Sequence, residues 1–211
     1  MTSYTIYMQQ LIADHFKSLD LNYDPYDIHK YENFLLLMQK WNKAFNLTSI
    51  VNPKDMIERH LVESLAFGPY LCGSNIVDIG SGAGIPGVPL AISNPDKNFV
   101  LIESRAKRAR FLRHVSGELG LSNVEVEESR AERVSLTEYF DTAVVKAVAD
   151  PFKLFSLVKH LLNNNGIILV LAKDGLLDDD VSKKKEFELI DIKDPLIDRL
   201  KGSLIRIKRS N

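Results

Sequence analysis

Apolar residues follow two different periods along this chain of 211 residues. In residues 1 to 71 they recur every three or four positions, a spacing that places them on one face of a helix. From residue 74 onward, short apolar runs alternate with helical segments, which indicates βαβ units and a mainly parallel sheet. The clearest helical stripe, which we expect to be part of the core, consists of Ile28, Tyr31, Leu35, Met38 and Trp41.

The short apolar runs predict the strands of the sheet. A helix is predicted before them, from about Pro53 to Tyr70, because Asn52 suits the N-cap and proline suits the first helical position. Two late runs, 187–192 and 203–207, have no convincing helix between them, so we predict an antiparallel hairpin at one side of the sheet. The parallel strands are expected at 76–79, 99–103, 124–126, 142–145 and 167–171.

These elements predict a doubly wound, Rossmann-like α/β fold with a helical extension. The extension would span residues 1–73 and pack on a core of residues 74–211. Hydrophobic residues make up 45% and charged residues 26% of the chain, which is ordinary for a globular protein. With one cysteine, Cys72, and no apolar run near the roughly 18 residues of a membrane span, we expect a cytoplasmic protein without membrane or metal.

Charge is unevenly distributed along the chain. The formal net charge of −1 gives no overall attraction to nucleic acid, so an RNA-binding surface would need local clusters of positive charge. Residues 105–113 contain five basic residues and no acidic one, whereas residues 118–141 are mainly acidic. This basic segment is either a solvated helix face or a surface that binds phosphates.

The most informative segment runs from residue 77 to residue 88, where an apolar strand leads into Gly80, Gly82, Gly84 and Gly87. Glycines let the chain turn sharply and bring backbone amides close to a ligand, and the helix that follows presents unpaired N–H groups. Glu103 closes the next strand, where a carboxylate can accept hydrogen bonds from both hydroxyls of a ribose. These features predict a nucleoside ligand and fit NAD and S-adenosylmethionine equally.

A resemblance to a known family favours S-adenosylmethionine over NAD. Five segments carry this resemblance: WNKAFNLT at 41–48, RHLVESL at 59–65, VDIGSGAGIPG at 77–87, ESRAKR at 103–108 and RAE at 130–132. In the order and spacing of these segments, the chain resembles the RsmG (GidB) family of 16S rRNA guanine-N7 methyltransferases. The resemblance implies a class I methyltransferase fold, S-adenosylmethionine as cofactor, and 16S rRNA or the 30S subunit as partner.

The resemblance also implies which residues hold the cofactor. Glu103 would hold the ribose, and Ala131 with Glu132 would border the adenine. Where the family usually has an arginine after the fourth core strand, this chain has Lys146, which keeps the charge but loses the planar fork for bidentate contacts. The expected cofactor-binding residues are Asp78, Gly80, Ser81, Gly82, Gly84, Ile85, Glu103, Ser104, Ala131, Glu132 and Lys146.

The implied target is N7 of a guanine in the 530 loop. This atom carries a lone pair and no proton, so its attack requires no general base, and we expect no catalytic acid or base. Proximity and orientation can supply about 7 to 11 kcal/mol, with Lys146 and Lys173 as candidate positioning groups. His60, Trp41 and Thr48 are interpreted as structural, and by the resemblance the segment with Arg59, His60, Glu63 and Ser64 would organise the wall beside the glycine loop. The expected RNA contacts are Arg105, Lys107, Arg108, Arg110, Lys146 and Lys173.

Three other classes of function stay open at this point. An NAD-dependent oxidoreductase fits the glycine loop, although no Tyr-Lys or His-Asp arrangement for its catalysis is evident. A non-catalytic RNA-binding or assembly protein is conceivable because of Lys146. A methyltransferase acting on another RNA, a protein or a small molecule would use the same cofactor with a different pocket. We expect the chain to act as a monomer.

Overall fold

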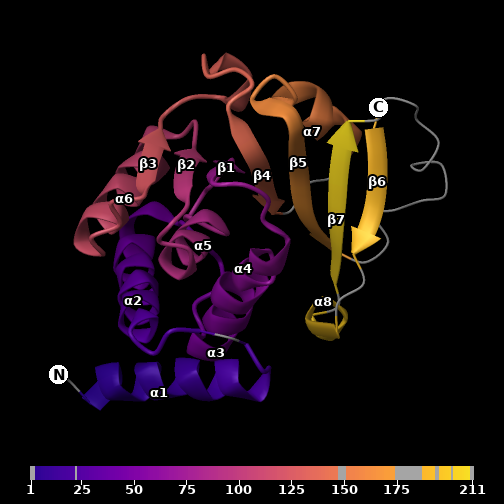
Figure 1. The fold of residues 1–211 in the computed structure, drawn as a ribbon. Helices are drawn as coiled ribbons and strands as arrows, with labels where there is room; N and C mark the ends of the chain where they lie inside the picture. Colours follow the sequence, from indigo (N-terminus) through magenta and orange to yellow (C-terminus); the bar gives the residue numbers. More distant parts are fainter. Residues whose placement is uncertain are drawn as a thin grey trace.

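A seven-stranded sheet forms the centre of the described part of the molecule (Figure 1), with the strand order β3-β2-β1-β4-β5-β7-β6. The computed structural model describes residues 3–21, 23–146, 151–173, 187–192, 195–200 and 202–209. Strands β1 to β5 pair in parallel, while β7 runs antiparallel to β5 and β6. The strands are β1 Asn75–Ile79, β2 Asn98–Ile102, β3 Val124–Glu127, β4 Phe140–Lys146, β5 Leu162–Lys173, β6 Phe187–Ile192 and β7 Gly202–Arg209.

Neighbouring residues of a strand point to opposite faces of the sheet, so apolar side chains lie on both faces, and helices cover both. Ile76 of β1 packs in a cluster with residues of α5 (Gly87–Ser93), whereas Val77 packs in a cluster with residues of α7 (Pro151–Val158). The α5 side also carries α6 (Ala106–Glu118). This arrangement confirms the predicted doubly wound α/β fold.

The N-terminal segment is helical, as predicted, and consists of α1 (Ser3–Ser18), α2 (Asp27–Phe45) and a helical stretch that begins at Pro53. The predicted stripe on α2 is buried, except that Trp41 is half-buried and packs on Phe45 and Phe111. One hydrophobic cluster joins α1 and α2 to α5 and α6. The division of the chain at residue 73 stays a prediction.

The helix predicted from Pro53 to Tyr70 is present but irregular. Asn52 caps it as expected, since its side chain accepts hydrogen bonds from the N–H groups of Lys54 and Asp55. The stretch then consists of α3 (Pro53–Met56), a π-helical turn (Ile57–Val62) and α4 (Glu63–Leu65), with a 3-10 turn at Gly68–Tyr70. Such π-helical turns are frequent at functional sites.

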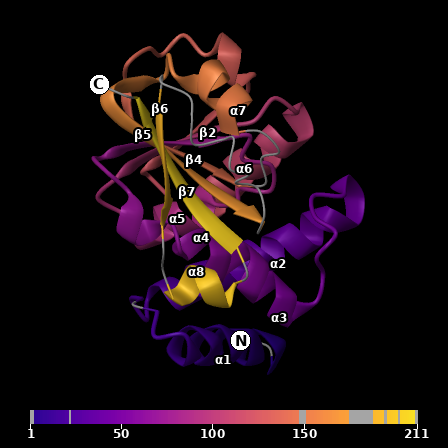
Figure 2. The same cartoon turned by 90° about the vertical axis from the view of Figure 1, so that its right-hand side faces the viewer.

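The C-terminal hairpin confirms one prediction and corrects another. Strands β6 and β7 pair antiparallel as expected, but α8 (Pro195–Arg199) lies between them, where no convincing helix was predicted. This helix has five residues, too few to show a helical period, and it is held by buried Ile197 and by a contact from Arg199 to Ser18 of α1. Figure 2 shows α8 beside α1, at the end of the molecule far from α7. In the described part of the chain, no helix is long and apolar enough to cross a membrane.

Candidate active site

The glycine loop follows β1 at the carboxyl edge of the parallel strands, the edge where ligands bind in open α/β sheets. Gly80 and Gly82 have φ angles of +70° and +58°, in a backbone region that residues other than glycine rarely adopt. Gly80 is exposed, and a Cβ built on it would meet no atom within 4 Å. The loop therefore leaves open space beside its backbone, which fits the predicted approach of a nucleoside.

The side chains of Asp78 and Ser81 hold this loop in place. Asp78 is 1% exposed, and its Oδ2 accepts a hydrogen bond of 3.0 Å from the N–H of Gly87. The Ser81 hydroxyl donates to the carbonyl of Asp78 over 3.1 Å. Burial raises the pKa of Asp78 to about 7, with a smaller rise from Glu103 and an opposing effect of Lys146. The contacts of both side chains support the loop.

The raised pKa of Asp78 predicts a pH-dependent stability. The folded chain holds a proton on Asp78 up to about pH 7, whereas the ordinary pKa is 3.8. The contribution of the protonated Asp78 to stability is complete below the ordinary pKa of 3.8, and it is lost as the pH rises through the folded-state pKa of about 7. Asp78→Asn cannot ionise, so its free energy of unfolding should rise relative to wild type by about 3 kcal/mol between about pH 5 and pH 8.

Urea denaturation at both pH values measures this difference. Asp96→Asn is the matched control, because Asp96 is exposed. An equal pH dependence of wild type and Asp78→Asn would show that Asp78 ionises normally in the folded chain.

Glu103 follows β2 and connects the loop to the start of α6. Its Oε2 accepts a hydrogen bond of 3.0 Å from the N–H of Gly82, and its Oε1 accepts one of 2.8 Å from the N–H of Arg105. Arg108 also lies 3.9 Å from Oε2. A carboxylate oxygen has two lone pairs, so each oxygen retains one acceptor position. Glu103 thus has the capacity to accept hydrogen bonds from two ribose hydroxyls.

A cavity of about 260 Å³ lies over the loop, and both the sheet and the N-terminal helices line it. Of the predicted site residues it contains Gly80, Ser81, Gly82, Ile85, Arg108 and Lys146. The N-terminal helical segment contributes Leu47, Thr48, Ile50, Arg59 and His60. The segment with Arg59 and His60 was expected to organise a wall beside the glycine loop, and both residues line this cavity, whereas Leu47 and Ile50 were not predicted to be in the site.

Lys146 is held against the N-terminal wall of this cavity. Its Nζ lies 2.9 Å from Oε2 of the buried Glu63 and donates a hydrogen bond to the carbonyl of Arg59. Arg59 in turn pairs with Oε1 of Glu63 over 2.7 Å. Burial lowers the pKa of Lys146, and Glu63 opposes this shift. An ammonium group has three donors, so Lys146 retains one that these two contacts do not use.

His60 forms the adjoining part of the wall. It is 4% exposed, and its Nε2 lies 3.2 Å from the hydroxyl of Thr48, which also accepts a hydrogen bond from the N–H of Ile50. Burial and, to a smaller extent, the charge of Lys146 lower the pKa of His60 to about 4. The imidazole is therefore neutral near pH 7, and its contacts agree with the structural role expected from the sequence.

Asp78, Glu103 and four other predicted cofactor residues do not line this cavity. Ala131 is half-buried in a 3-10 turn and packs against the cluster below α7, as does Ile79. Glu132 is exposed and lies 3.9 Å from Arg130. Gly84 packs against Val88 and so has a structural role in the loop. Ser104 is exposed directly after Glu103.

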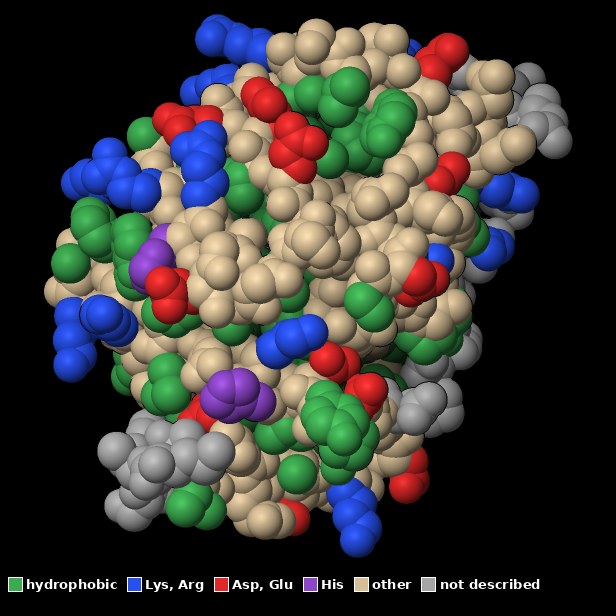
Figure 3. Space-filling view, turned by 60° about the vertical axis from the view of Figure 1, so that its left-hand side comes forward, with side chains coloured by type: hydrophobic (Ala, Val, Ile, Leu, Met, Phe, Trp, Pro, Cys, Tyr) green, Lys and Arg blue, Asp and Glu red, His purple; other side chains and the backbone are tan. Residues whose placement is uncertain are grey.

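Of the predicted RNA-contacting residues that the structure describes, Arg108 and Lys146 line the cavity. Arg105, Lys107 and Arg110 are exposed at the start of α6, and Lys107 lies over the ring of Phe45 at 5.9 Å. Figure 3 brings the α6 side of the molecule forward and shows lysine and arginine side chains near one edge, with hydrophobic side chains between them. Lys173 ends β5, but its side chain lies outside the described residues. Among the described residues, no group of three potential metal ligands was found.

Solved structures share this fold at low sequence identity. A ribosomal protein L11 methylase from Lactobacillus delbrueckii subsp. bulgaricus has a TM-score of 0.55 and 12% identity, with coverage of 77% of this chain and 81% of that one. A SAM-dependent methyltransferase from Aquifex aeolicus has a TM-score of 0.52 and 13% identity, with coverage of 81% and 97%. The fold is therefore that of class I methyltransferases.

Sequence comparison identifies the family. The model of the GidB family, described as rRNA small subunit methyltransferase G, matches residues 27–204. A ribosomal RNA small subunit methyltransferase G from Psychromonas ingrahamii is 40% identical over 175 residues, covering 82% of this chain and 84% of the relative. Its counterpart from Shewanella amazonensis is 44% identical over 159 residues, covering 75% and 77%. The chain therefore belongs to the GidB family of rRNA small subunit methyltransferases.

Proposed function

We propose that this chain transfers a methyl group from S-adenosylmethionine to N7 of a guanine in the 530 loop of 16S rRNA, acting as a monomer in the cytoplasm. The observation that carries the proposal is the cavity in which the glycine loop faces Thr48, Arg59 and His60. Both sides of this cavity lie within the part of the chain that the family model matches.

The residues present fit S-adenosylmethionine. The open backbone at Gly80, with Gly82 beside it, would bind the amino-acid part and the sugar, Glu103 would bind the ribose hydroxyls, and Ala131 with Glu132 would border the adenine. When bound, the cofactor supplies an electrophilic methyl group on a sulfonium. The chain itself has to orient the guanine and exclude competing nucleophiles.

The side chains around the cavity suit a reaction that needs no proton transfer. His60 is neutral near pH 7, buried, and bonded to Thr48, so it keeps its place in the wall. Lys146 is fixed by Glu63 and retains a donor with which to orient the base. Guanine N7 has no proton to lose, and positioning alone can supply about 7 to 11 kcal/mol.

The substrate would be held by its phosphates. Arg105, Lys107 and Arg110 are exposed on the first turns of α6, next to the loop, and Arg108 enters the cavity. Arginine and lysine contacts to phosphates fix the register of a nucleic acid without reading its sequence. Lys173, at the end of β5, is proposed as a further contact at the same carboxyl edge.

Transfer of labelled methyl groups to 30S subunits and to 16S rRNA that lack this modification tests the proposal. The expected result is a single N7-methylguanine in the 530 loop, located by mass spectrometry. Label at another position would keep the methyltransferase and overturn the substrate. Cofactor binding without transfer to any RNA would favour the non-catalytic alternative, and binding of NAD instead would favour an oxidoreductase.

A further inference from the structure

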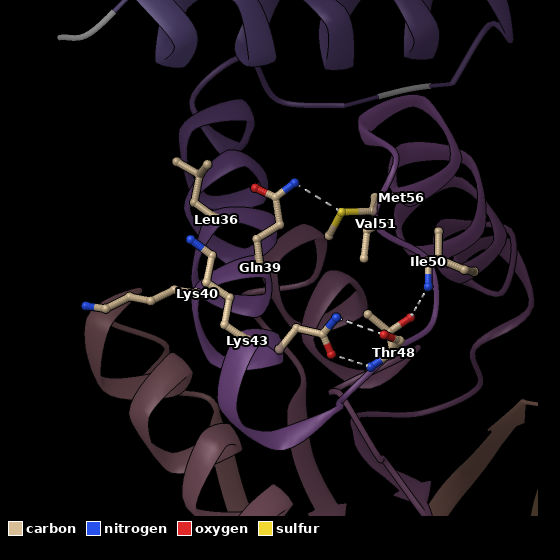
Figure 4. A pocket seen from close by; sticks show the side chains of 9 residues that line it. Leu36, Gln39, Lys40, Lys43, Thr48, Ile50, Val51 and Met56 are labelled. Carbon is tan, nitrogen blue, oxygen red and sulfur yellow. Dashed lines mark hydrogen bonds between the residues drawn. The ribbon is translucent and has the colours of Figure 1, made fainter.

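A second cavity, of about 440 Å³, lies between α2 and the segment 48–56, outside the glycine loop. Figure 4 shows α2 on one side of it, with Leu36, Gln39, Lys40 and Lys43, and Thr48, Ile50, Val51 and Met56 on the other. Thr48 and Ile50 also line the cavity over the glycine loop. The two cavities therefore adjoin each other across one short segment of the chain.

The walls of this second cavity are held in place by polar contacts. The side chain of Asn42 donates to the carbonyl of Thr48 over 2.8 Å and accepts from its N–H over 2.9 Å. The amide nitrogen of Gln39 lies 3.4 Å from the sulfur of Met56. Both contacts join α2 to the opposite wall, so the opening is fixed by specific bonds across it.

The lining of this cavity combines apolar side chains with two lysines. Leu36, Ile50, Val51 and Met56 present apolar surface, and Val51 is 63% exposed. Lys40 and Lys43 are exposed, and neither forms an ion pair with a residue that the structure describes. Four of the nine lining residues are apolar and five are polar or charged, and the volume lies within the roughly 300 to 1,000 Å³ that is typical of small-ligand sites.

These properties match an unpaired nucleotide. Bases that leave a stack are bound between apolar or aromatic side chains, while lysines neutralise the phosphates on either side. RNA that is recognised in loops presents such splayed bases. Because the two cavities share Thr48 and Ile50 in their walls, two neighbouring nucleotides of one strand can be assigned to them.

We propose that the cavity between α2 and residues 48–56 binds a nucleotide of the single-stranded RNA next to the methylated guanine. The apolar walls would hold the base, and Lys40 and Lys43 would contact the adjoining phosphates. This inference rests on the proposed function, because it takes the neighbouring cavity as the place of methyl transfer. It makes the N-terminal helices a determinant of substrate binding.

The double variant Lys40→Gln/Lys43→Gln tests the lysines against Lys17→Gln/Lys159→Gln, which removes the same charge from two exposed lysines elsewhere. The expected result is a KM for 30S subunits raised about tenfold, with unchanged affinity for S-adenosylmethionine. The dependence of log KM on log salt should become less steep by about 1.4, since each phosphate contact to a single strand contributes about 0.7. Equal KM values and salt slopes for the two double variants would overturn the inference.

A crosslinking measurement locates the base without relying on activity. A 530-loop oligonucleotide with 4-thiouridine beside the target guanine should crosslink to the wild-type chain within residues 36–56, and the Lys40→Gln/Lys43→Gln variant should lose most of this product. Crosslinks confined to α6, or a ribosomal protein crosslinked at residues 36–56 in intact 30S subunits, would overturn it. Lysine-dependent crosslinking without methyl transfer would keep this RNA site and overturn the proposed function alone.

Discussion

Replacing Glu103 with glutamine is expected to lower the affinity for S-adenosylmethionine by about 100-fold. The Glu103 carboxylate accepts hydrogen bonds from the N–H groups of Gly82 and Arg105, one on each oxygen. Glutamine has one acceptor oxygen, and its NH₂ group would face one of these N–H groups, donor against donor. The variant thus disturbs the glycine loop and also removes an acceptor for the ribose. Isothermal titration calorimetry with S-adenosylmethionine measures the loss.

The control for this prediction is Glu125→Gln, an exposed glutamate on β3 whose change also removes one negative charge. Its affinity for the cofactor should equal that of wild type. If Glu103→Gln bound S-adenosylmethionine as tightly as wild type does, Glu103 would have no part in holding the ribose. Urea denaturation of the variant separates an effect on the cofactor from a general loss of stability.

The parts of the site that sequence reasoning predicted are local in the chain. A strand, a glycine loop and a helix follow one another within residues 75–93, and each glycine with a positive φ reports on its own backbone. Glu103 was found by its distance along the chain from the loop, because the two strands of a βαβ unit end at the same edge. Such features depend on residues that are close together along the chain, so a single sequence is enough to predict them.

The contacts that build the N-terminal wall of the cavity were not predicted, because they join distant segments of the chain. Glu63 meets Lys146 across more than eighty positions, and no period or motif in one sequence relates those two residues. Arg59 and His60 were expected on a helix beside the glycine loop, but the π-helical turn at Ile57–Val62 that carries them was not predicted. Helix α8 was missed for a different reason, its length of five residues.

Replacing Gly87 with alanine is expected to lower the free energy of unfolding by about 3 kcal/mol, the upper range for overpacking a core. A Cβ at this position would lie 2.3 Å from Cδ2 of Leu101 and 2.6 Å from Oδ2 of Asp78. Leu101 is 0% exposed and Asp78 is 1% exposed, so neither has room to withdraw. For a chain of this size, the melting temperature should fall by roughly 6 to 12 °C.

The comparison with Gly117→Ala separates this steric effect from the helix preference of alanine. Gly117 lies in α6, and a Cβ there would meet no atom within 4 Å, so this variant should be stabilised by about 0.5 to 1 kcal/mol. If Gly87→Ala lowers and Gly117→Ala raises the free energy of unfolding, then Gly87 is required because β2 and Asp78 approach it closely. A neutral Gly87→Ala would mean that α5 can move away from β2, and the loop would then not be fixed by this contact. Because Gly87 also donates its N–H to Asp78, its displacement should weaken cofactor binding together with stability.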